Sequence, residues 1–219
     1  MHQIGQLIPE VLKTSQLTPE LPTSSAWAPV FDAWHPSLAP AAAKVAEYVH
    51  AMASGGFPHW LTLSGLPGCG KTMFAKQIFR EVKANINPGR HSLWVSGKDI
   101  HRDENRRPRC VWYTVRDFKD DMLGGQWDLP EYLRNDFLVV IDDLGATRDT
   151  KDNALADGLY RLADNRIGRW TVWTTNLSLA EIAVKIDARI SSRLVRDDNR
   201  VITITAPDYA LRPKPAPTA

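Results

Sequence analysis

The sequence lacks the features that define several protein classes. Its 219 residues include only two cysteines, Cys69 and Cys110, which excludes a disulfide framework and a four-cysteine zinc site. Neither sign of charge dominates, because the chain has 27 Lys and Arg residues and 25 Asp and Glu residues. Nucleic-acid binding would therefore need a local basic patch. No apolar run approaches the roughly 20 residues of a membrane span. We therefore expect a reducing, cytoplasmic location without a membrane partner.

Composition and length fit one α/β domain with short appendages. The chain is 43% hydrophobic and 24% charged, which is typical of a globular protein. Residues 1–30 carry four prolines and predict a flexible arm. Its apolar residues could dock on a partner or pack on the core; they are Ile4, Leu7, Ile8, Val11 and Leu12. Residues 31–206 are the expected core, and 207–219 a Pro-rich tail.

Strand and helix patterns alternate along the core. Strands are predicted at 59–65, 111–115, 137–142, 170–175 and 201–205. Helices are predicted at 38–53, 71–84, 116–123 and 153–166. Such alternation predicts an α/β three-layer sandwich, in which helices cover both faces of a mainly parallel five-stranded sheet. An extra strand is expected at 92–96, followed by a basic loop.

The clearest motif is a phosphate-binding loop at Gly65–Thr72, which satisfies G-x-x-x-x-G-K-[ST] between a predicted strand and a predicted helix. Its glycines allow backbone N–H groups to point at phosphate oxygens. Lys71 supplies a positive charge to the β- and γ-phosphates, and Thr72 offers its hydroxyl to Mg²⁺. The candidate nucleotide-binding residues are Gly65, Pro67, Gly68, Cys69, Gly70, Lys71, Thr72 and Met73.

Two acidic residues end the apolar run FLVVIDD. Ligands of open α/β sheets bind beyond the carboxyl ends of the strands, so Asp142 is expected to face the phosphate loop and hold Mg²⁺. Asp143 is placed to polarise an attacking water. The alternative is that both carboxylates cap the next helix. Beside a phosphate loop, the catalytic interpretation is favoured.

Together these motifs resemble the AAA+ ATPase module of the DnaC helicase loaders and the IstB transposition helpers, with DnaA more distant. The resemblance covers about residues 30–212. It begins at the aromatic motif Phe31–Trp34 and continues through the phosphate loop and FLVVIDDLG. It implies an AAA+ P-loop NTPase fold, ATP as the nucleotide and Mg²⁺ as its ion. A helical lid domain is not expected, since only 26 residues follow Arg193.

The resemblance also assigns roles to single residues. Asn176, after the strand WTVWTT, matches the sensor asparagine that helps to place the attacking water. The alternative is that it caps the next helix, SLAEIAVK at 178–185, and one residue could do both; the resemblance favours the sensor role. In DARISSRL the arginine finger is placed at Arg193, with Arg189 as the alternative. Asp143 stands where many AAA+ proteins have glutamate, which puts the rate of hydrolysis in question. Arg166 falls where the family often has a basic residue, without a defined role.

The function that follows from this resemblance is an ATP-hydrolysing replication factor of the helicase-loader type. Its expected partners are a hexameric replicative helicase, single-stranded DNA and further copies of itself. The alternatives are a transposition helper that binds duplex DNA and a transposase, and a small-molecule kinase. The basic loop either contacts DNA or is an ordinary solvated loop; its arginines are Arg102, Arg106, Arg107 and Arg109.

Overall fold

The structure is a computed structural model, and it describes residues 35–85, 109–125, 128, 130, 133–146 and 154–211. The predicted arm at 1–30, the aromatic motif at 31–34 and the extra strand at 92–96 lie outside the described residues. No helix within these described stretches has both the length and the apolarity to cross a bilayer.

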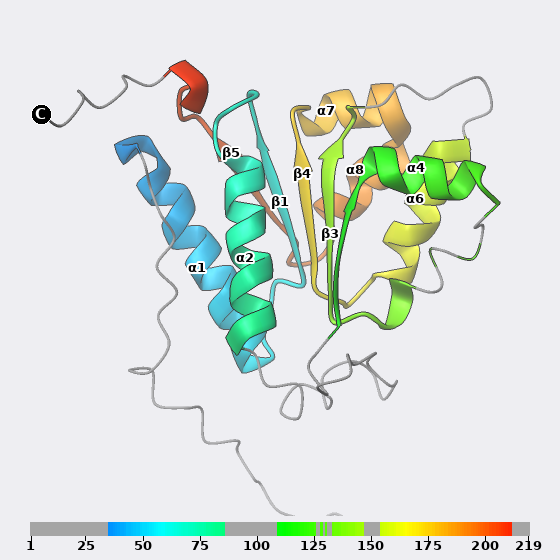
Figure 1. Cartoon of the computed structure of the whole chain (residues 1–219), viewed down its shortest axis with the longest axis horizontal. Helices are drawn as coiled ribbons and strands as arrows, with labels where there is room; N and C mark the ends of the chain where they lie inside the picture. Colours follow the sequence, from blue (N-terminus) through cyan, green and yellow to red (C-terminus); the bar gives the residue numbers. More distant parts are fainter. Residues whose placement is uncertain are drawn as a thin grey trace, which may run out of the picture.

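A sheet of five strands forms the centre of the molecule (Figure 1). The strands are β1 (Trp60–Gly65), β2 (Cys110–Thr114), β3 (Leu138–Leu144), β4 (Thr171–Thr175) and β5 (Arg200–Ile204). Their order is β2-β3-β4-β1-β5, and every neighbouring pair is parallel. The predicted five-stranded parallel sheet is confirmed. Because β4 separates β1 from β3, the phosphate-loop strand and the strand of the acidic pair flank the strand that precedes Asn176.

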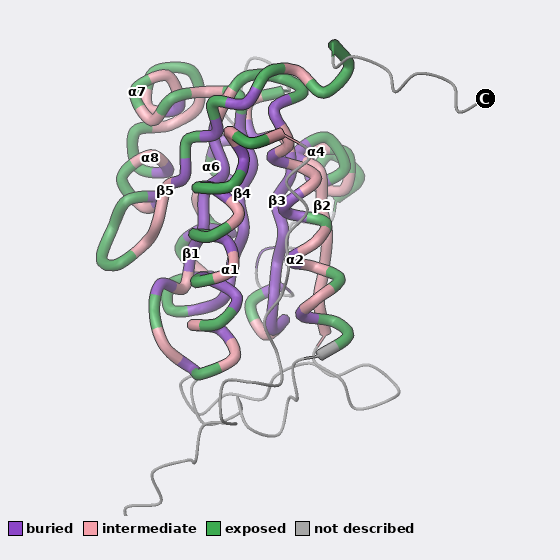
Figure 2. The backbone as a smooth tube through the Cα atoms, turned by 90° about the vertical axis from the view of Figure 1, so that its left-hand side faces the viewer, coloured by how far each residue is buried: buried purple, intermediate pink, exposed green. Residues whose placement is uncertain are grey.

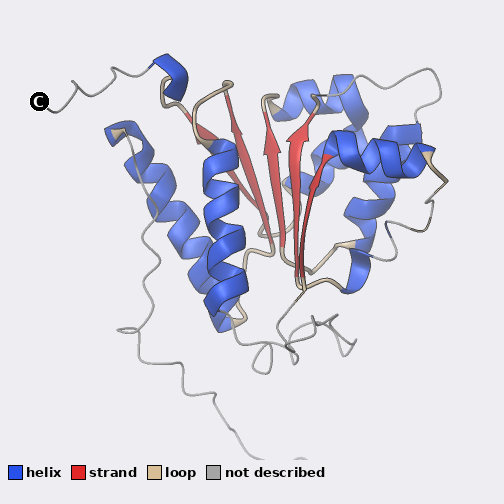
Figure 3. Ribbon diagram, in the orientation of Figure 1, coloured by secondary structure: helices blue, strands red, loops and turns tan. Residues whose placement is uncertain are grey.

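Helices pack on both faces of the sheet, which gives three layers (Figure 3). The α-helices are α1 (Ala39–Ser54), α2 (Lys71–Asn85), α4 (Val115–Leu123), α6 (Ala154–Asn165), α7 (Leu179–Ile182) and α8 (Ala188–Leu194). Short turns of other helix types are η1 (Pro36–Leu38), η2 (Leu133–Asn135), η3 (Ala183–Asp187) and η4 (Tyr209–Leu211). Helices α1 and α2 cover one face, and α4, α6, α7 and α8 contribute to the core on the other.

The central strands are apolar on both sides because each side meets a helical layer. Along β3, Leu138 and Val140 belong to the core cluster of α1 and α2. Val139 and Ile141 belong to the cluster on the opposite face. Figure 2 shows β3 and β4 buried along their length, whereas the helices alternate between buried and exposed residues. A continuous apolar run is the pattern expected of a parallel strand covered twice.

The helix ends carry recognisable local signals. Helix α1 ends at Ser54 and is followed by Gly55, whose φ of 71° is left-handed and favours glycine. Helix α7 begins with a capping box, in which Ser178 and Glu181 each accept a backbone N–H of the other. Asp187 then caps α8 through the N–H of Arg189. The chain after Asn176 thus folds as α7, the π turn η3 and α8.

After β5 the described chain returns to the phosphate loop. The N–H of Tyr209 donates to the carbonyl of Gly68 over 3.0 Å, and the Asp208 carboxylate accepts the N–H of Ala210. Among residues 205–211, η4 is the only helical segment. The tail predicted from residue 207 therefore begins with an ordered turn on the loop, and residues 212–219 lie outside the description.

Candidate nucleotide-binding site

The phosphate loop connects β1 to α2 at the carboxyl edge of the sheet (Figure 1). Gly65 has a φ of 148°, and a Cβ there would lie 2.4 Å from the carbonyl oxygen of Ile204. Gly68 has a φ of 74°, and a Cβ there would lie 1.9 Å from Oδ1 of Asp208. Both positions therefore exclude a side chain through backbone conformation and through close approach. The structure explains why this turn needs glycine.

Lys71 and Thr72 open helix α2 with their polar atoms directed at neighbouring polar groups. The ammonium group of Lys71 is buried and donates to the carbonyl of Leu66 over 2.7 Å. The hydroxyl of Thr72 donates to Oδ1 of Asp142 over 3.0 Å. The cation of Lys71, the start of helix α2 and the carboxylate of Asp142 from β3 thus lie close together. This set of groups can hold a phosphate chain together with its counterion.

Asp142 and Asp143 lie at the end of β3, where one extra residue of β3 breaks the register with β4 between Ile141 and Leu144. Asp143 has a φ of 61°, an uncommon conformation for a residue other than glycine. Thr174 holds this bulge: its hydroxyl donates to Asp142 and accepts the N–H of Asp143. The bulge thus lies at the acidic pair, at the carboxyl end of β3, and bulges are common beside functional sites.

The environment of Asp143 changes its proton affinity. Burial raises the pKa of the Asp143 carboxyl above its ordinary value, and the negative charge of Asp142 raises it further, while Lys71 opposes both. A carboxylate of raised pKa is a stronger base than an ordinary surface aspartate. This property fits a group that orients or polarises a water molecule.

Asn176 follows β4 directly and is exposed. Its neighbour Thr175 pairs with Ser64 of β1 on one side and with Leu144 of β3 on the other. Asn176 therefore lies at the same edge of the sheet as the phosphate loop and the acidic pair. Ser178, not Asn176, caps α7, so the alternative role as a helix cap is wrong.

The oxygen donors at this edge fit a magnesium ion. Mg²⁺ prefers carboxylate and hydroxyl oxygens and is usually held by one or two protein groups plus substrate phosphates. Asp142 and Thr72 supply one carboxylate and one hydroxyl in direct contact. Thr72 directly follows Lys71 in the sequence, so the contact between Thr72 and Asp142 lies beside the cation of the loop.

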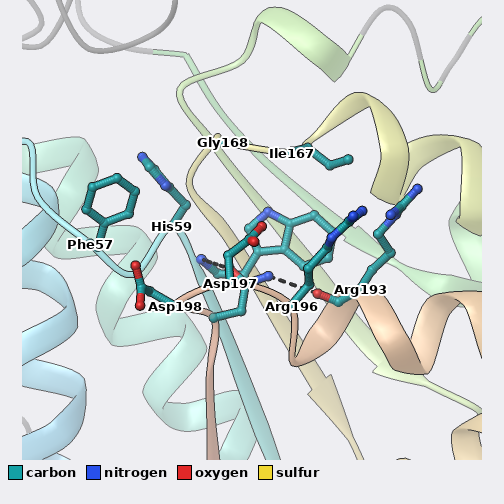
Figure 4. Close-up of a pocket in the computed structure, with 10 residues that line it drawn as sticks. Phe57, His59, Ile167, Gly168, Arg193, Arg196, Asp197 and Asp198 are labelled. Atoms are coloured by element: carbon teal, nitrogen blue, oxygen red, sulfur yellow. Dashed lines mark hydrogen bonds between the residues drawn. The ribbon is translucent and has the colours of Figure 1, made fainter.

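The two candidate finger arginines, Arg189 and Arg193, both lie on α8. Arg193 lines a hollow of about 180 Å³ together with Trp60 at the start of β1 and Asn199 just before β5. Figure 4 shows its side chain pointing away from the loop that enters β5 and toward α6, where Asp164 accepts its hydrogen bond. This hollow is at the amino edge of the sheet, opposite the acidic pair. Arg193 therefore does not join the site formed by Lys71.

Of the four arginines considered for DNA binding, only Arg109 belongs to the described residues. Its Nε lies 3.1 Å from a carboxylate oxygen of Asp136, whose side chain is fully buried. Its carbonyl also accepts the N–H of Phe137. Arg109 thus fixes the start of β2 against the start of β3. Arg102, Arg106 and Arg107 lie outside the described part of the chain.

A family comparison decides the class of this site. The model of the ATPase family associated with various cellular activities (AAA) matches residues 61–196, which include the phosphate loop, the acidic pair, Asn176 and Arg193. The chain belongs to the AAA family. Membership implies nucleotide binding at the loop, and the predicted P-loop ATPase family is confirmed. No curated protein matches the chain in sequence.

Solved structures share the fold of this AAA chain. The DnaC helicase loader is 22% identical with a TM-score of 0.57, over 82% of this chain and 98% of the other. DnaA from Aquifex aeolicus, bound to AMPPCP, is 13% identical with a TM-score of 0.59, over 79% and 48%. DnaI is 19% identical with a TM-score of 0.52, over 76% and 82%. The chain thus spans about half the length of DnaA, and these identities establish the fold alone.

Three residues of the site were not foreseen from the sequence. Thr174 is one of two threonines before Asn176, and only the structure shows which of them contacts the acidic pair. Asp208 and Tyr209 reach the phosphate loop from the far end of the chain. The sequence signal for them is weak, because a single acidic residue after a strand has many structural roles.

Proposed function

We propose that this AAA chain binds and hydrolyses ATP as a replication factor of the helicase-loader type, acting with single-stranded DNA and a replicative helicase. The observation that carries the ATPase part is the 3.0 Å contact between Thr72 and Asp142. It joins the start of the phosphate-loop helix to the acidic end of β3. This contact supports a shared role for the two elements in binding a nucleotide and its metal ion.

The residues of the site divide the chemistry between them. The loop amides and Lys71 bind the phosphates and neutralise their charge. Thr72 and Asp142 would hold Mg²⁺, which supplies positive charge to the phosphate oxygens. Asp143, with its raised pKa, accepts a hydrogen bond from the attacking water, and Asn176 orients that water from the neighbouring strand.

Arg193 completes the site of another copy of the chain. It lies near the amino edge of the sheet, whereas the phosphate loop is at the carboxyl edge, so its guanidinium would stabilise charge on a neighbour's nucleotide. Hydrolysis is then expected to depend on assembly. A dilute protomer should turn over slowly, and the shorter Asp143 in place of glutamate contributes to that slowness.

The loader assignment is supported by the similarity of the fold to the DnaC helicase loader, whose structure the chain covers to 98%. A transposition helper of the IstB type would carry the same motifs at the nucleotide site. The two functions differ in the nucleic acid and in the protein partner.

The ATPase part is tested by isothermal calorimetry with Mg²⁺ and ATP. Lys71→Ala should abolish binding, because it removes the buried cation of the loop. Lys76→Ala, on the exposed side of the same helix, is the matched control and should bind normally. Asp143→Asn should retain binding and lose turnover. Equal binding by Lys71→Ala and Lys76→Ala would refute the site.

The loader part is tested with the Asp143→Asn protein, which is expected to trap ATP. Its affinity for a single-stranded oligonucleotide is compared with that for the same sequence as a duplex, with and without a purified hexameric helicase. A loader should prefer the single strand and form a complex with the helicase. Preference for the duplex without helicase binding would instead favour the transposition helper.

A further inference from the structure

Two ion pairs connect α6 to α8 on either side of one tyrosine. Arg193 binds the carboxylate of Asp164 over 2.6 Å, and Arg189 binds that of Asp157 over 2.8 Å. Tyr160 lies between them in sequence. The guanidinium carbon of Arg189 is 4.3 Å from the centre of its ring, and that of Arg193 is 5.6 Å away.

The two arginines are held in different ways. Arg189 is half exposed and uses its Nε as well as its terminal nitrogen, because Asp187 accepts from both. Arg193 is held through one terminal nitrogen, which donates to Asp164 and to the hydroxyl of Tyr160. Its Nε is buried and has no hydrogen-bond partner among the described residues.

This difference matters because an arginine is best satisfied by two parallel hydrogen bonds to a planar or tetrahedral anion. Arg189 already has that arrangement with Asp187. In Arg193, one terminal nitrogen of the guanidinium binds Asp164, whereas its Nε has no hydrogen-bond acceptor among the described residues. A phosphate group could accept hydrogen bonds from both nitrogens. Asp164, by contrast, is half exposed, so water can replace Arg193 at its carboxylate at little cost.

We propose that Asp164 and Tyr160 hold Arg193 against its own protomer, in a position from which it cannot reach a neighbour's nucleotide. We call this the stowed position. On assembly, Arg193 exchanges the Asp164 carboxylate for a nucleotide phosphate of the neighbouring copy. Asp164 is then a positioning residue that influences the protein concentration at which copies of the chain assemble. This inference rests on the proposed function, since it requires that Arg193 acts on another protomer.

The test measures ATP turnover as a function of protein concentration. Asp164→Asn keeps the shape of the side chain and removes its charge, so the competent state of Arg193 becomes more populated. The protein concentration for half-maximal turnover should fall by about two- to fivefold, the range expected for a partly exposed ion pair. Asp164→Glu should restore the wild-type value.

Asp157→Asn is the matched control, because it breaks the equivalent ion pair of Arg189 on the same helix. It should leave the concentration dependence as it is in the wild type. A shift by Asp157→Asn without a shift by Asp164→Asn would overturn the proposal and point to Arg189 as the stowed residue. Equal shifts would also overturn it, since they would reflect the loss of surface charge alone.

A second readout separates this inference from the proposed function. Sedimentation with a non-hydrolysable ATP analogue gives the assembly midpoint, and Asp164→Asn should lower it only when Arg193 is present. In an Arg193→Ala background the substitution should have no effect. If Arg193→Ala removes concentration-dependent turnover but Asp164→Asn shifts nothing, only the stowed position is refuted. If Arg193→Ala behaves as wild type, the proposed finger itself is refuted.

Discussion

Arg166 offers the sharpest test of how the strands that carry the site are held. Its side chain is fully buried, and its guanidinium donates to six acceptors. These are the carbonyls of Leu133, Arg134, Asp136, Phe137 and Trp170, and the hydroxyl of Thr171. All six lie at or just before the starts of β3 and β4, so Arg166 binds together the amino ends of the two strands that end in the acidic pair and Asn176.

We expect Arg166→Met to destabilise the fold by about 3–5 kcal/mol. Methionine retains much of the length and the apolar stem, so the cavity is small. The loss comes from buried carbonyls left without a donor, each worth roughly 1–3 kcal/mol when unsatisfied. This loss is partly offset, because the substitution also removes the cost of burying a cation. Burial has such a cost here, since it lowers the pKa of Arg166 to about 9. The net value matches that for breaking a buried charged network, about 3–5 kcal/mol.

Urea unfolding measures this loss directly. With a slope of about 2 kcal/mol per molar urea, the midpoint should fall by about 1.5–2.5 M. Arg116→Met, at an exposed position of α4, is the matched control and should stay within about 0.5 kcal/mol of the wild type. If Arg166→Met unfolds at the same urea concentration as Arg116→Met, the hydrogen bonds to the strand starts do not stabilise the fold and the reasoning fails.

Two further predictions concern the nucleotide site. Gly68→Ala should weaken ATP binding, because the new Cβ would overlap Asp208 and the left-handed backbone costs about 1–2 kcal/mol. Adding Asp208→Ala should recover the part of the affinity that is lost through the overlap. If calorimetry shows no recovery, the contact between Gly68 and Asp208 is contradicted. Turnover should fall on acidification at a pH above that expected for an ordinary aspartate, because Asp143 acts as the carboxylate and its pKa is raised. A pH profile with its acid limb at or below about pH 3.9 would contradict that role.

Much of the sheet and the phosphate loop could be predicted from the sequence, because local chemistry determines them. A phosphate-binding turn needs glycines, lysine and a hydroxyl at fixed spacing, and Gly65–Thr72 supplies them. A doubly covered strand needs an uninterrupted apolar run, and β3 has one. The five strands predicted for the sheet therefore agree with the observed ones within one or two residues, whereas the extra strand expected at 92–96 lies outside the described residues.

The remaining contacts could not be predicted because they join residues far apart in the sequence. Asp208 meets Gly68 only after the chain has completed the sheet. Arg109 looked like a DNA contact because it lies among other arginines, yet its partner is a buried carboxylate. Arg166 had no defined role for the same reason, since its acceptors are backbone carbonyls that leave no trace in the side-chain pattern.

The position of Arg193 links the architecture to the need for more than one copy. The carboxyl edge of the sheet carries Lys71 and Asp142, whereas Arg193 lines a hollow at the amino edge. The sheet between them is rigid, because Arg166 and the two apolar layers fix its strands. The five residues of β4 alone extend further, at about 3.3 Å per residue, than an arginine side chain reaches, so rotation of Arg193 does not bring it to the phosphate loop of its own chain. If Arg193 contributes to hydrolysis, the phosphate that it stabilises must therefore belong to a neighbouring copy. The free energy of the ion pair between Arg193 and Asp164 is then the cost that binding to the neighbour's phosphate has to offset.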